Sequence, residues 1–304
     1  MREALHDDTL RTLGREDAEY PALLRPVPTA PASLHVRGRL VDGDALAVAL
    51  VGSRRATPYG LAVAETMAAD LAARGVTVVS GLARGVDSAA HRGALRVGGR
   101  TIAVLGSGVD SVYPPENRRL ADEIARQGAL LSQFPSGTPP LPQNFPTRNA
   151  VIAGLSLAVV VIEAAERSGS LITARLAAEL GREVLAVPGR VTAPESRGAN
   201  RLIQDGAALA LGWEDVVAAL PDRWKTCVDT AASMTSAATG PSETDDESNR
   251  VILSLLGEDP VDIDRVIERS GLGAARVSAT LLDLELSGRV RQIEGKRFVR
   301  AVLG

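Results

Sequence analysis

The chain has 304 residues, which is long for one domain and predicts one large domain and one small one. Its net charge of −3 is not that of a strongly basic nucleic-acid binder, although binding depends on where charges lie rather than on their sum. Cys227 is the only cysteine, which excludes an intrachain disulfide and a cysteine-based metal cluster. Because no apolar run is long enough to span a membrane and no signal-peptide pattern is present, we expect a cytoplasmic protein.

Residues 1–44 are predicted to form an N-terminal segment that leads into the main domain. Residues 1–19 are polar and acidic, with weak helical character. The proline-punctuated stretch 20–26 and the stretch 34–38 are typical of extended segments that lie against a core.

Residues 45–221 alternate between short apolar runs and stretches with a helical period. This alternation predicts a doubly wound, mostly parallel α/β sheet. The predicted strands are 45–51, 76–79, 101–105, 129–131, 158–162, 183–187 and 207–211. The predicted helices are 61–74, 86–96, 115–126, 171–180, 197–204 and 213–220. Residues 132–149 hold five prolines and are predicted to be a long functional loop.

The composition changes after Leu220. Residues 222–249 are rich in Ser, Thr, Ala and acidic residues without an apolar period, which predicts a flexible linker. Residues 250–304 contain three amphipathic stretches followed by an alternating hairpin that turns near Glu294 and Gly295. Three helices followed by a hairpin predict a small C-terminal winged-helix domain.

Small and cationic residues follow the predicted strands of the large domain. Since the loops after parallel strands lie along one edge of a sheet, these segments are expected to converge. Glycine lets a backbone approach a ligand closely, and a helix N-terminus offers unpaired N–H groups to anions. The pattern therefore predicts a long phosphate-binding groove, built from residues 51–55, 80–88, 106–108, 144–149 and 163–170.

Phe145 is the most informative aromatic residue, because aromatics make up only 3% of the chain. It lies in a proline-rich polar stretch beside Arg148 and Asn149. It is either a stacking platform for an unpaired base, worth about 1–3 kcal/mol per base, or an anchor tucked into the core. In the first case Arg148 would neutralise backbone charge, and Asn149 would bond a base edge or brace the loop.

Known catalytic and cofactor motifs are missing from the sequence. There is no Walker A pattern, and residues 106–111 carry two of the three glycines of the dinucleotide fingerprint. Ser53 lacks a nucleophile elbow and is better interpreted as a hydroxyl donor to phosphate. We therefore predict no catalytic residue, no metal and no cofactor. His91 is left open between a phosphate contact and helix packing, and Glu163 is expected to order the loop at Ser168–Ser170.

One enzymatic alternative remains from the residues alone. Rossmann-like proteins with glycine-rich loops and a Ser-Gly-Ser turn also resemble nucleotide phosphoribohydrolases of the lysine decarboxylase-like group. Such an enzyme would need a carboxylate and an arginine in the groove, for which Glu163 and Arg167 are the candidates.

The motifs in order resemble the DNA-processing protein A family (DprA, also called Smf) over about residues 20–215. They are Tyr20-Pro21 through residues 34–38, Val51–Arg54, Ser80–His91, Val112–Asn117, Phe145–Asn149 and Ser168–Ala174. The resemblance implies an extended Rossmann-like fold, single-stranded DNA binding, a homodimer, and loading of RecA recombinase during natural transformation. Members often carry an N-terminal helical domain, which we expect to be truncated or absent here, and many carry a C-terminal winged helix.

The groove and the resemblance together give a set of predicted DNA-binding residues. They are Gly52, Ser53, Arg54, Gly81, Ala83, Arg84, Gly85, Asp87, Gly106, Ser107, Gly108, Phe145, Arg148, Asn149, Ser168, Gly169, Ser170 and Thr173.

Overall fold

The structure is a computed structural model that describes residues 10–228, 243–257, 260–286, 290–293 and 297–300. The chain divides into two compact units, Met1–Met234 and Thr235–Gly304. Within the described residues, no helix has the length and apolar character that a bilayer crossing requires.

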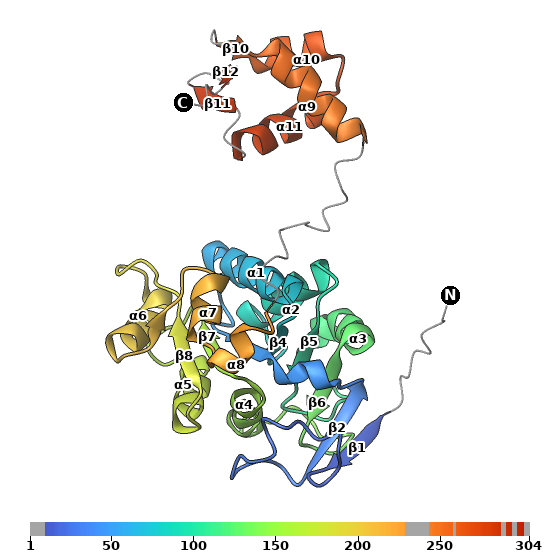
Figure 1. Ribbon diagram of the computed structural model, residues 1–304, viewed down its shortest axis with the longest axis vertical. Helices are drawn as coiled ribbons and strands as arrows, with labels where there is room; N and C mark the ends of the chain where they lie inside the picture. Colours follow the sequence, from blue (N-terminus) through green and yellow to red (C-terminus); the bar gives the residue numbers. More distant parts are fainter. Residues whose placement is uncertain (1–9, 229–242, 258–259, 287–289, 294–296, 301–304) are drawn as a thin grey trace. The chain divides into compact units, whose positions relative to one another are not determined.

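The first unit is built on a nine-stranded sheet with the order β1-β2-β6-β5-β4-β3-β7-β8-β9 (Figure 1). Strands β3 to β9 are parallel, whereas β2 runs antiparallel to both β1 and β6. The strands are β1 (Arg11–Gly14), β2 (Ser33–Gly38), β3 (Ala47–Val51), β4 (Thr77–Ser80), β5 (Thr101–Val104), β6 (Ala129–Ser132), β7 (Ala158–Val161), β8 (Glu183–Ala186) and β9 (Ala208–Leu209). The predicted doubly wound, mostly parallel sheet is confirmed, and the N-terminal segment adds two strands to it.

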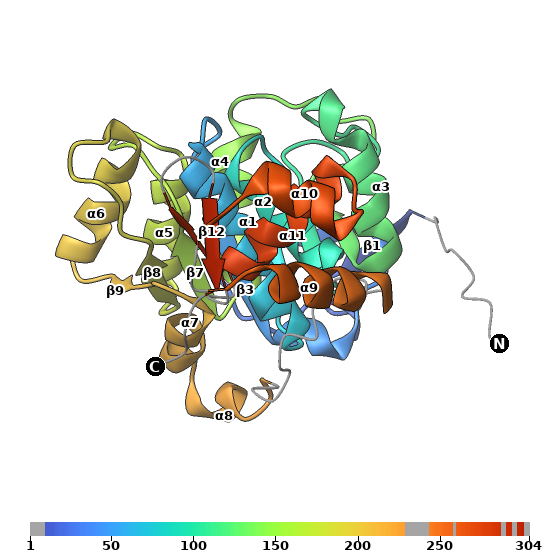
Figure 2. The same cartoon turned by 90° about the horizontal axis from the view of Figure 1, so that it is seen from above.

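Helices cover both faces of this sheet because its strands are apolar on both sides. In β3, Val48 and Leu50 pack under α1 (Pro58–Ala73), α2 (Val86–Arg96) and α7 (Trp213–Ala219). Ala47 and Ala49 pack with α4 (Asn144–Leu155), α5 (Ser170–Glu179) and α6 (Arg197–Gln204) on the opposite face. Helix α3 (Arg118–Gln127) lies toward the β1 end of the unit and α6 toward the β9 end (Figure 2).

The strand order reverses between β3 and β7. From β3 the chain proceeds through β4 to β6 on one side, and it then crosses to β7 on the other side of β3. The loops after these two strands leave in opposite directions, and this divergence is where open parallel sheets form ligand crevices. The topology therefore locates a candidate site at the carboxyl ends of β3 and β7.

The long loop predicted for residues 132–149 is shorter than expected. Helix α4 begins at Asn144, so the motif from Asn144 to Asn149 forms its first turns. Pro146 is tolerated there, because the first N–H groups of a helix have no partner within the helix. Proline density had concealed this helix start, while the buried Val151, Ile152 and Leu155 show its core-facing side.

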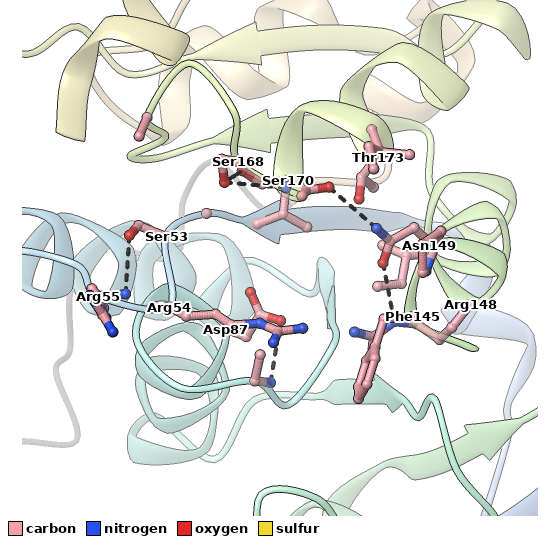
Figure 3. Close-up of a pocket in the computed structure, with 18 of the residues that line it drawn as sticks. Ser53, Arg54, Arg55, Asp87, Phe145, Arg148, Asn149, Ser168, Ser170 and Thr173 are labelled. Atoms are coloured by element: carbon pink, nitrogen blue, oxygen red, sulfur yellow. Dashed lines mark hydrogen bonds between the residues drawn. The ribbon is translucent and has the colours of Figure 1, made fainter. Parts of the chain in front are cut away.

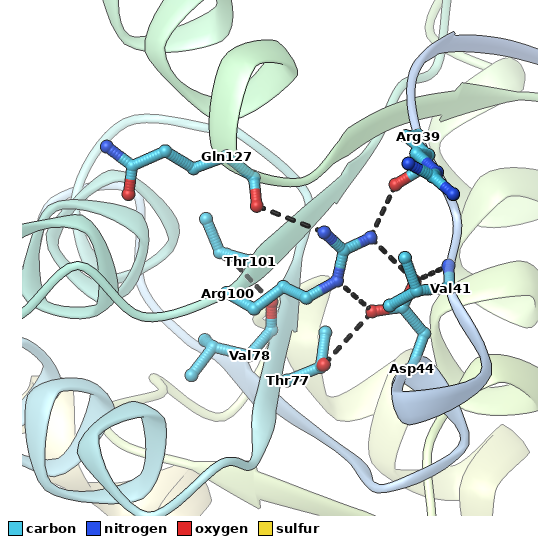
Figure 4. A network of polar contacts seen from close by, with 8 residues as sticks. All are labelled: Arg39, Val41, Asp44, Thr77, Val78, Arg100, Thr101 and Gln127. Atoms are coloured by element: carbon cyan, nitrogen blue, oxygen red, sulfur yellow. Dashed lines mark hydrogen bonds and ion pairs between the residues drawn. The ribbon is translucent and has the colours of Figure 1, made fainter. Parts of the chain in front are cut away.

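A polar clamp fixes the opposite, amino edge of the sheet (Figure 4). The Arg100 guanidinium donates to Asp44 Oδ2 at 2.8 Å and to the carbonyls of Arg39 and Gln127. The Asp44 carboxylate also accepts from Thr77 Oγ1 at 3.1 Å. These contacts tie the end of the N-terminal segment to the starts of β4 and β5.

Arg100→Ala is expected to lower the free energy of unfolding by about 1–3 kcal/mol, because the largely buried Asp44 carboxylate loses its charged donor. Urea denaturation measures the change. The matched control is Arg175→Ala, whose ion pair with Glu179 is exposed and should contribute less than about 0.5 kcal/mol. Equal losses in both variants would mean that the clamp contributes no more than a surface pair.

The second unit has the predicted winged-helix architecture. Its elements are α9 (Glu243–Leu255), β10 (Val261–Asp262), α10 (Ile263–Ser270), α11 (Ala274–Leu286), β11 (Val290–Ile293) and β12 (Arg297–Arg300). The strands form a sheet in the order β10-β12-β11, and Val266, Leu281 and Phe298 lie in its core. The predicted turn at Glu294 and Gly295 lies outside the described residues.

The predicted linker at residues 222–249 is wrong at both ends. At its start, the short helix α8 (Asp222–Lys225) belongs to the first unit. At its end, α9 already begins at Glu243, where an acidic first turn suits a helix N-terminus. Residues 229–242 lie outside the described part of the chain.

Candidate nucleic-acid interface

A cavity of about 870 Å³ opens at the carboxyl ends of β3 and β7, at the point where the strand order reverses (Figure 3). Its walls come from the loops after β3, β4, β5 and β6, from the start of α4, and from the segment that leads from β7 into α5. The site therefore has the position that the sequence and the topology indicate.

The cavity brings together most of the predicted site residues. Those that line it are Gly52, Ser53, Arg54, Ala83, Asp87, Phe145, Arg148, Asn149, Ser168, Gly169, Ser170 and Thr173. Those that do not are Gly81, Arg84, Gly85, Gly106, Ser107 and Gly108. Tyr113 and the loop prolines at positions 140 and 142 line the cavity but lie outside the predicted groove segments. Arg55 and Pro146 also line it, and they lie within those segments but not in the predicted set of DNA-binding residues. The signal for Tyr113 was present in the motif Val112–Asn117.

The loop between β3 and α1 is held by Glu163 at the end of β7. The Ser53 N–H donates to the Glu163 carbonyl at 2.6 Å. The buried Glu163 carboxylate accepts from the N–H and the hydroxyl of Thr57, each at 2.8 Å, and Thr57 caps α1. A carboxylate of the protein itself therefore sits at the N-terminus of α1, where a bound phosphate would otherwise lie.

This arrangement corrects the expected role of Glu163. It orders the Ser53–Thr57 loop rather than the loop at Ser168–Ser170. It also weakens the enzymatic alternative, because a glycosidic hydrolase needs an accessible carboxylate and Glu163 is 3% exposed with its oxygens engaged. Arg167, the other residue of that alternative, is an exposed residue of the cavity wall.

Arg148 and Asp87 form the floor of the cavity. The Arg148 guanidinium donates to the carbonyl of Gly81 at 2.6 Å and to that of Val104. The Asp87 carboxylate accepts from the N–H groups of Gly81 at 3.2 Å and Ala83 at 3.3 Å. Both side chains thus connect the loop after β4 to its neighbours.

Burial is the largest cause of the pKa shifts of both Asp87 and Arg148. It raises the pKa of Asp87, which the charge of Arg148 opposes. Burial also lowers the pKa of Arg148 to about 10, so this side chain stays charged at neutral pH. We had expected Arg148 to face a phosphate, but it is 4% exposed and its guanidinium bonds to backbone carbonyls.

The glycines of the loops make room for other parts of the protein. A Cβ at Gly81 would lie 2.6 Å from the Arg148 guanidinium, and one at Gly106 would lie 2.9 Å from the Phe145 ring. The sequence pattern predicts these glycines to be points of close approach to a ligand. The structure shows instead that their missing side chains let neighbouring loops pack against each other.

The loop at Gly106–Gly108 lies beneath the surface rather than in the groove. Its three residues are buried, and Ser107 Oγ donates to the Ser111 carbonyl at 2.5 Å. Arg84 lies outside the cavity as well, where it pairs with Glu116 on the surface.

Phe145 is half-buried in the cavity wall, and two guanidinium groups lie close to its ring. The Arg54 guanidinium carbon lies 5.0 Å from the ring centroid, and that of Arg148 lies 5.9 Å away. Arg54 is exposed and forms no ion pair among the described residues, although its charge acts on the buried Asp87 of the same cavity. The cavity thus presents an exposed cation that forms no ion pair, in contact with an aromatic ring.

The segment from Ser168 to Ser170 closes the far wall of the cavity. The hydroxyls of Ser168 and Ser170 lie 2.7 Å apart, and Asn149 Nδ2 donates to the Gly169 carbonyl at 3.3 Å. Asn149 therefore braces α4 against this segment, which is one of the two roles left open for it. His91 is fully buried outside the cavity, and burial lowers its pKa to about 3, which favours the packing role.

Comparison with known proteins supports the same family for both units. The family model described as DNA recombination-mediator protein A matches residues 11–221, and that of the DprA winged helix domain matches residues 236–296. Protein Smf of Synechocystis sp. is 38% identical, over 94% of this chain and 79% of that protein.

Two solved structures share this fold at substantial identity. DprA from Streptococcus pneumoniae aligns with a TM-score of 0.66 and 42% identity, over 71% of this chain and 76% of that one. DprA from Helicobacter pylori, described for its single-stranded DNA binding mode, aligns with a TM-score of 0.62 and 32% identity, over 68% and 94%. The chain therefore belongs to the DNA recombination-mediator protein A (DprA/Smf) family.

Proposed function

We propose that the cavity between β3 and β7 binds single-stranded DNA without strong sequence preference. The observation that carries the proposal is the contact of Arg54 with Phe145 in this cavity. An exposed guanidinium without an ion-pair partner suits a phosphate and an aromatic face suits a base, and every nucleotide offers both groups. The structure of DprA from Helicobacter pylori, which is described for its single-stranded DNA binding mode, supports the same assignment.

In this proposal, Arg54 and Ser53 contact the phosphate. Ser53 Oγ accepts from the Arg55 N–H at 3.1 Å, so its own hydrogen is free to donate to a phosphate oxygen. The hydroxyls of Ser168 and Ser170 lie at the start of α5 and bond to each other, which leaves one hydroxyl hydrogen of the pair free to donate to DNA. Arg148 contributes its charge to the cavity floor while it holds the neighbouring loops in place.

Phe145 supplies the base contact of the site. A base can stack on its ring only when that base is unpaired, so the site should favour single strands over duplex. Arg54 lies over the ring in the free protein. When DNA binds, its guanidinium must therefore leave the ring and contact a phosphate, so that a base can stack on Phe145.

The test is a fluorescence anisotropy titration with labelled oligothymidine and with an oligothymidine–oligoadenine duplex of equal length. We expect the single strand to bind at least about tenfold more tightly, a difference of about 1.4 kcal/mol. Equal affinity for both, or no binding of either, would contradict the proposal.

Two finer parts of the function rest on the family. We propose that the protein acts in recombination by loading RecA onto the bound strand, which a binding assay with immobilised RecA tests.

We also propose a homodimer formed through the first unit. Strand β9 lies at the edge of the sheet, and Leu209 in it and Leu211 just after it are 44% and 74% exposed. Exposed apolar side chains beside an unpaired strand edge form a surface that a second copy of the chain would cover. Sedimentation should give a dimer for the natural protein and a monomer for Leu211→Arg; a natural protein that sediments as a monomer contradicts it.

A further inference from the structure

Tyr113 lines the same cavity from the loop that follows β5, and it is 39% exposed. We propose that Tyr113 is a second aromatic base contact, which stacks on the nucleotide next to the one on Phe145. This inference rests on the proposed single-stranded DNA binding and extends it by one subsite, whose ligand is an unpaired nucleobase.

The loop that carries Tyr113 is anchored on both sides. Before it, the Ser111 carbonyl accepts from Ser107 Oγ and the Ser111 N–H donates to the Gly108 carbonyl at 2.9 Å. After it, Asn117 Nδ2 donates to the Leu82 carbonyl at 2.8 Å and is buried. The anchored loop therefore holds Tyr113 at the rim of the cavity, where its side chain is exposed.

The hydroxyl of Tyr113 differs from those of the other two tyrosines. Tyr20 donates to the Pro31 carbonyl at 2.8 Å, and Tyr59 donates to the Pro188 carbonyl at 3.1 Å. Across the part of the chain that the structure describes, no hydrogen bond of the Tyr113 hydroxyl is found. An exposed ring with an unused hydroxyl combines an apolar face with a polar end, which suits a base and its polar edge.

The geometry assigns Tyr113 a base of its own. Its ring centroid lies 6.0 Å from that of Phe145, and the two planes are tilted by 53°. A single base stacked between both rings would need them parallel, so the tilt favours a separate base for each ring. The short separation instead suits two neighbouring nucleotides of one strand. Phe145 is further covered by Arg54, whereas Tyr113 presents the more exposed ring.

The alternative role for Tyr113 is to support Phe145 without touching DNA, and a double-mutant cycle separates the two. Affinity for labelled oligothymidine is measured for the natural protein, Tyr113→Ala, Phe145→Ala and the double variant. A direct contact predicts that Tyr113→Ala weakens binding about 5- to 150-fold in both backgrounds. A supporting role predicts no further loss in the Phe145→Ala background, and this outcome overturns the inference.

Two further variants sharpen the test. Tyr113→Phe keeps the ring and should retain most of the affinity; a loss as large as that of Tyr113→Ala overturns stacking. Tyr59→Ala is the matched control, because Tyr59 is 52% exposed but does not line the cavity, and it should bind like the natural protein. If the natural protein does not bind oligothymidine, the proposed function fails. If it binds and only Phe145→Ala is impaired, this inference fails alone.

Discussion

Arg148→Ala is expected to lower the free energy of unfolding by about 3–5 kcal/mol, the usual effect of removing one partner from a buried charged network. The substitution leaves the carbonyls of Gly81 and Val104 without their charged donor. It also leaves the buried Asp87 without the positive charge that offsets its burial. Urea denaturation measures the loss.

The loss in Arg148→Ala should depend on pH. Burial penalises the charged form of Asp87 in the folded state and raises its pKa, and removal of Arg148 raises it further. A carboxyl whose folded pKa lies above its unfolded pKa costs stability as pH rises through the folded value. The deficit relative to the natural protein should therefore shrink as pH falls, and Asp87→Asn should recover part of it.

Arg167→Ala is the matched control for Arg148→Ala. Arg167 also lines the cavity, but it is exposed, and its substitution should change the free energy of unfolding by less than about 0.5 kcal/mol. A loss in Arg148→Ala no larger than this would show that its contacts with the two carbonyls do not stabilise the fold.

Phe145→Ala is expected to weaken binding of oligothymidine by about 1–3 kcal/mol, or about 5- to 150-fold. The ring that receives the base is lost, and with it the surface on which Arg54 rests. Because Phe145 is only half-buried, the cost in stability should stay below the 3–5 kcal/mol typical of a buried phenylalanine. Affinity and melting temperature are measured on the same variant.

Phe145→Tyr is the companion to this variant, since it keeps the ring and should retain binding. The opposite pattern in Phe145→Ala, a much lower melting temperature with normal DNA affinity, would identify the residue as a core anchor. The site would then bind through phosphate contacts alone.

Local sequence patterns were sufficient for most of the fold. The unbroken apolar run of β3 and the helical period of α2 match the structure closely, because burial on both faces of a parallel sheet leaves a direct trace in sequence. The start of α4 was missed because its prolines and polar residues resemble those of a loop. The start of α9 was missed and assigned to the linker, because the first turn of this helix is polar.

The contacts inside the site could not be predicted in the same way. Glu163 meets Thr57 across 106 positions of the sequence, and Arg148 meets Gly81 across 67. Nothing in a local pattern tells whether a groove arginine faces solvent, like Arg54, or bonds to backbone carbonyls, like Arg148. The same limit applies to the glycines, since a glycine required by Phe145 has the same sequence signal as one required by a ligand.

The most direct test of the central claim is the salt dependence of oligothymidine binding by the natural protein and by Arg54→Ala. If Arg54 neutralises one phosphate, the variant should bind more weakly, and its plot of log affinity against log salt concentration should be shallower by about 0.7. Arg175→Ala, on the exposed side of α5 and outside the cavity, should keep the natural slope. An Arg54→Ala variant with the affinity and the slope of the natural protein would contradict the assignment of this cavity to single-stranded DNA.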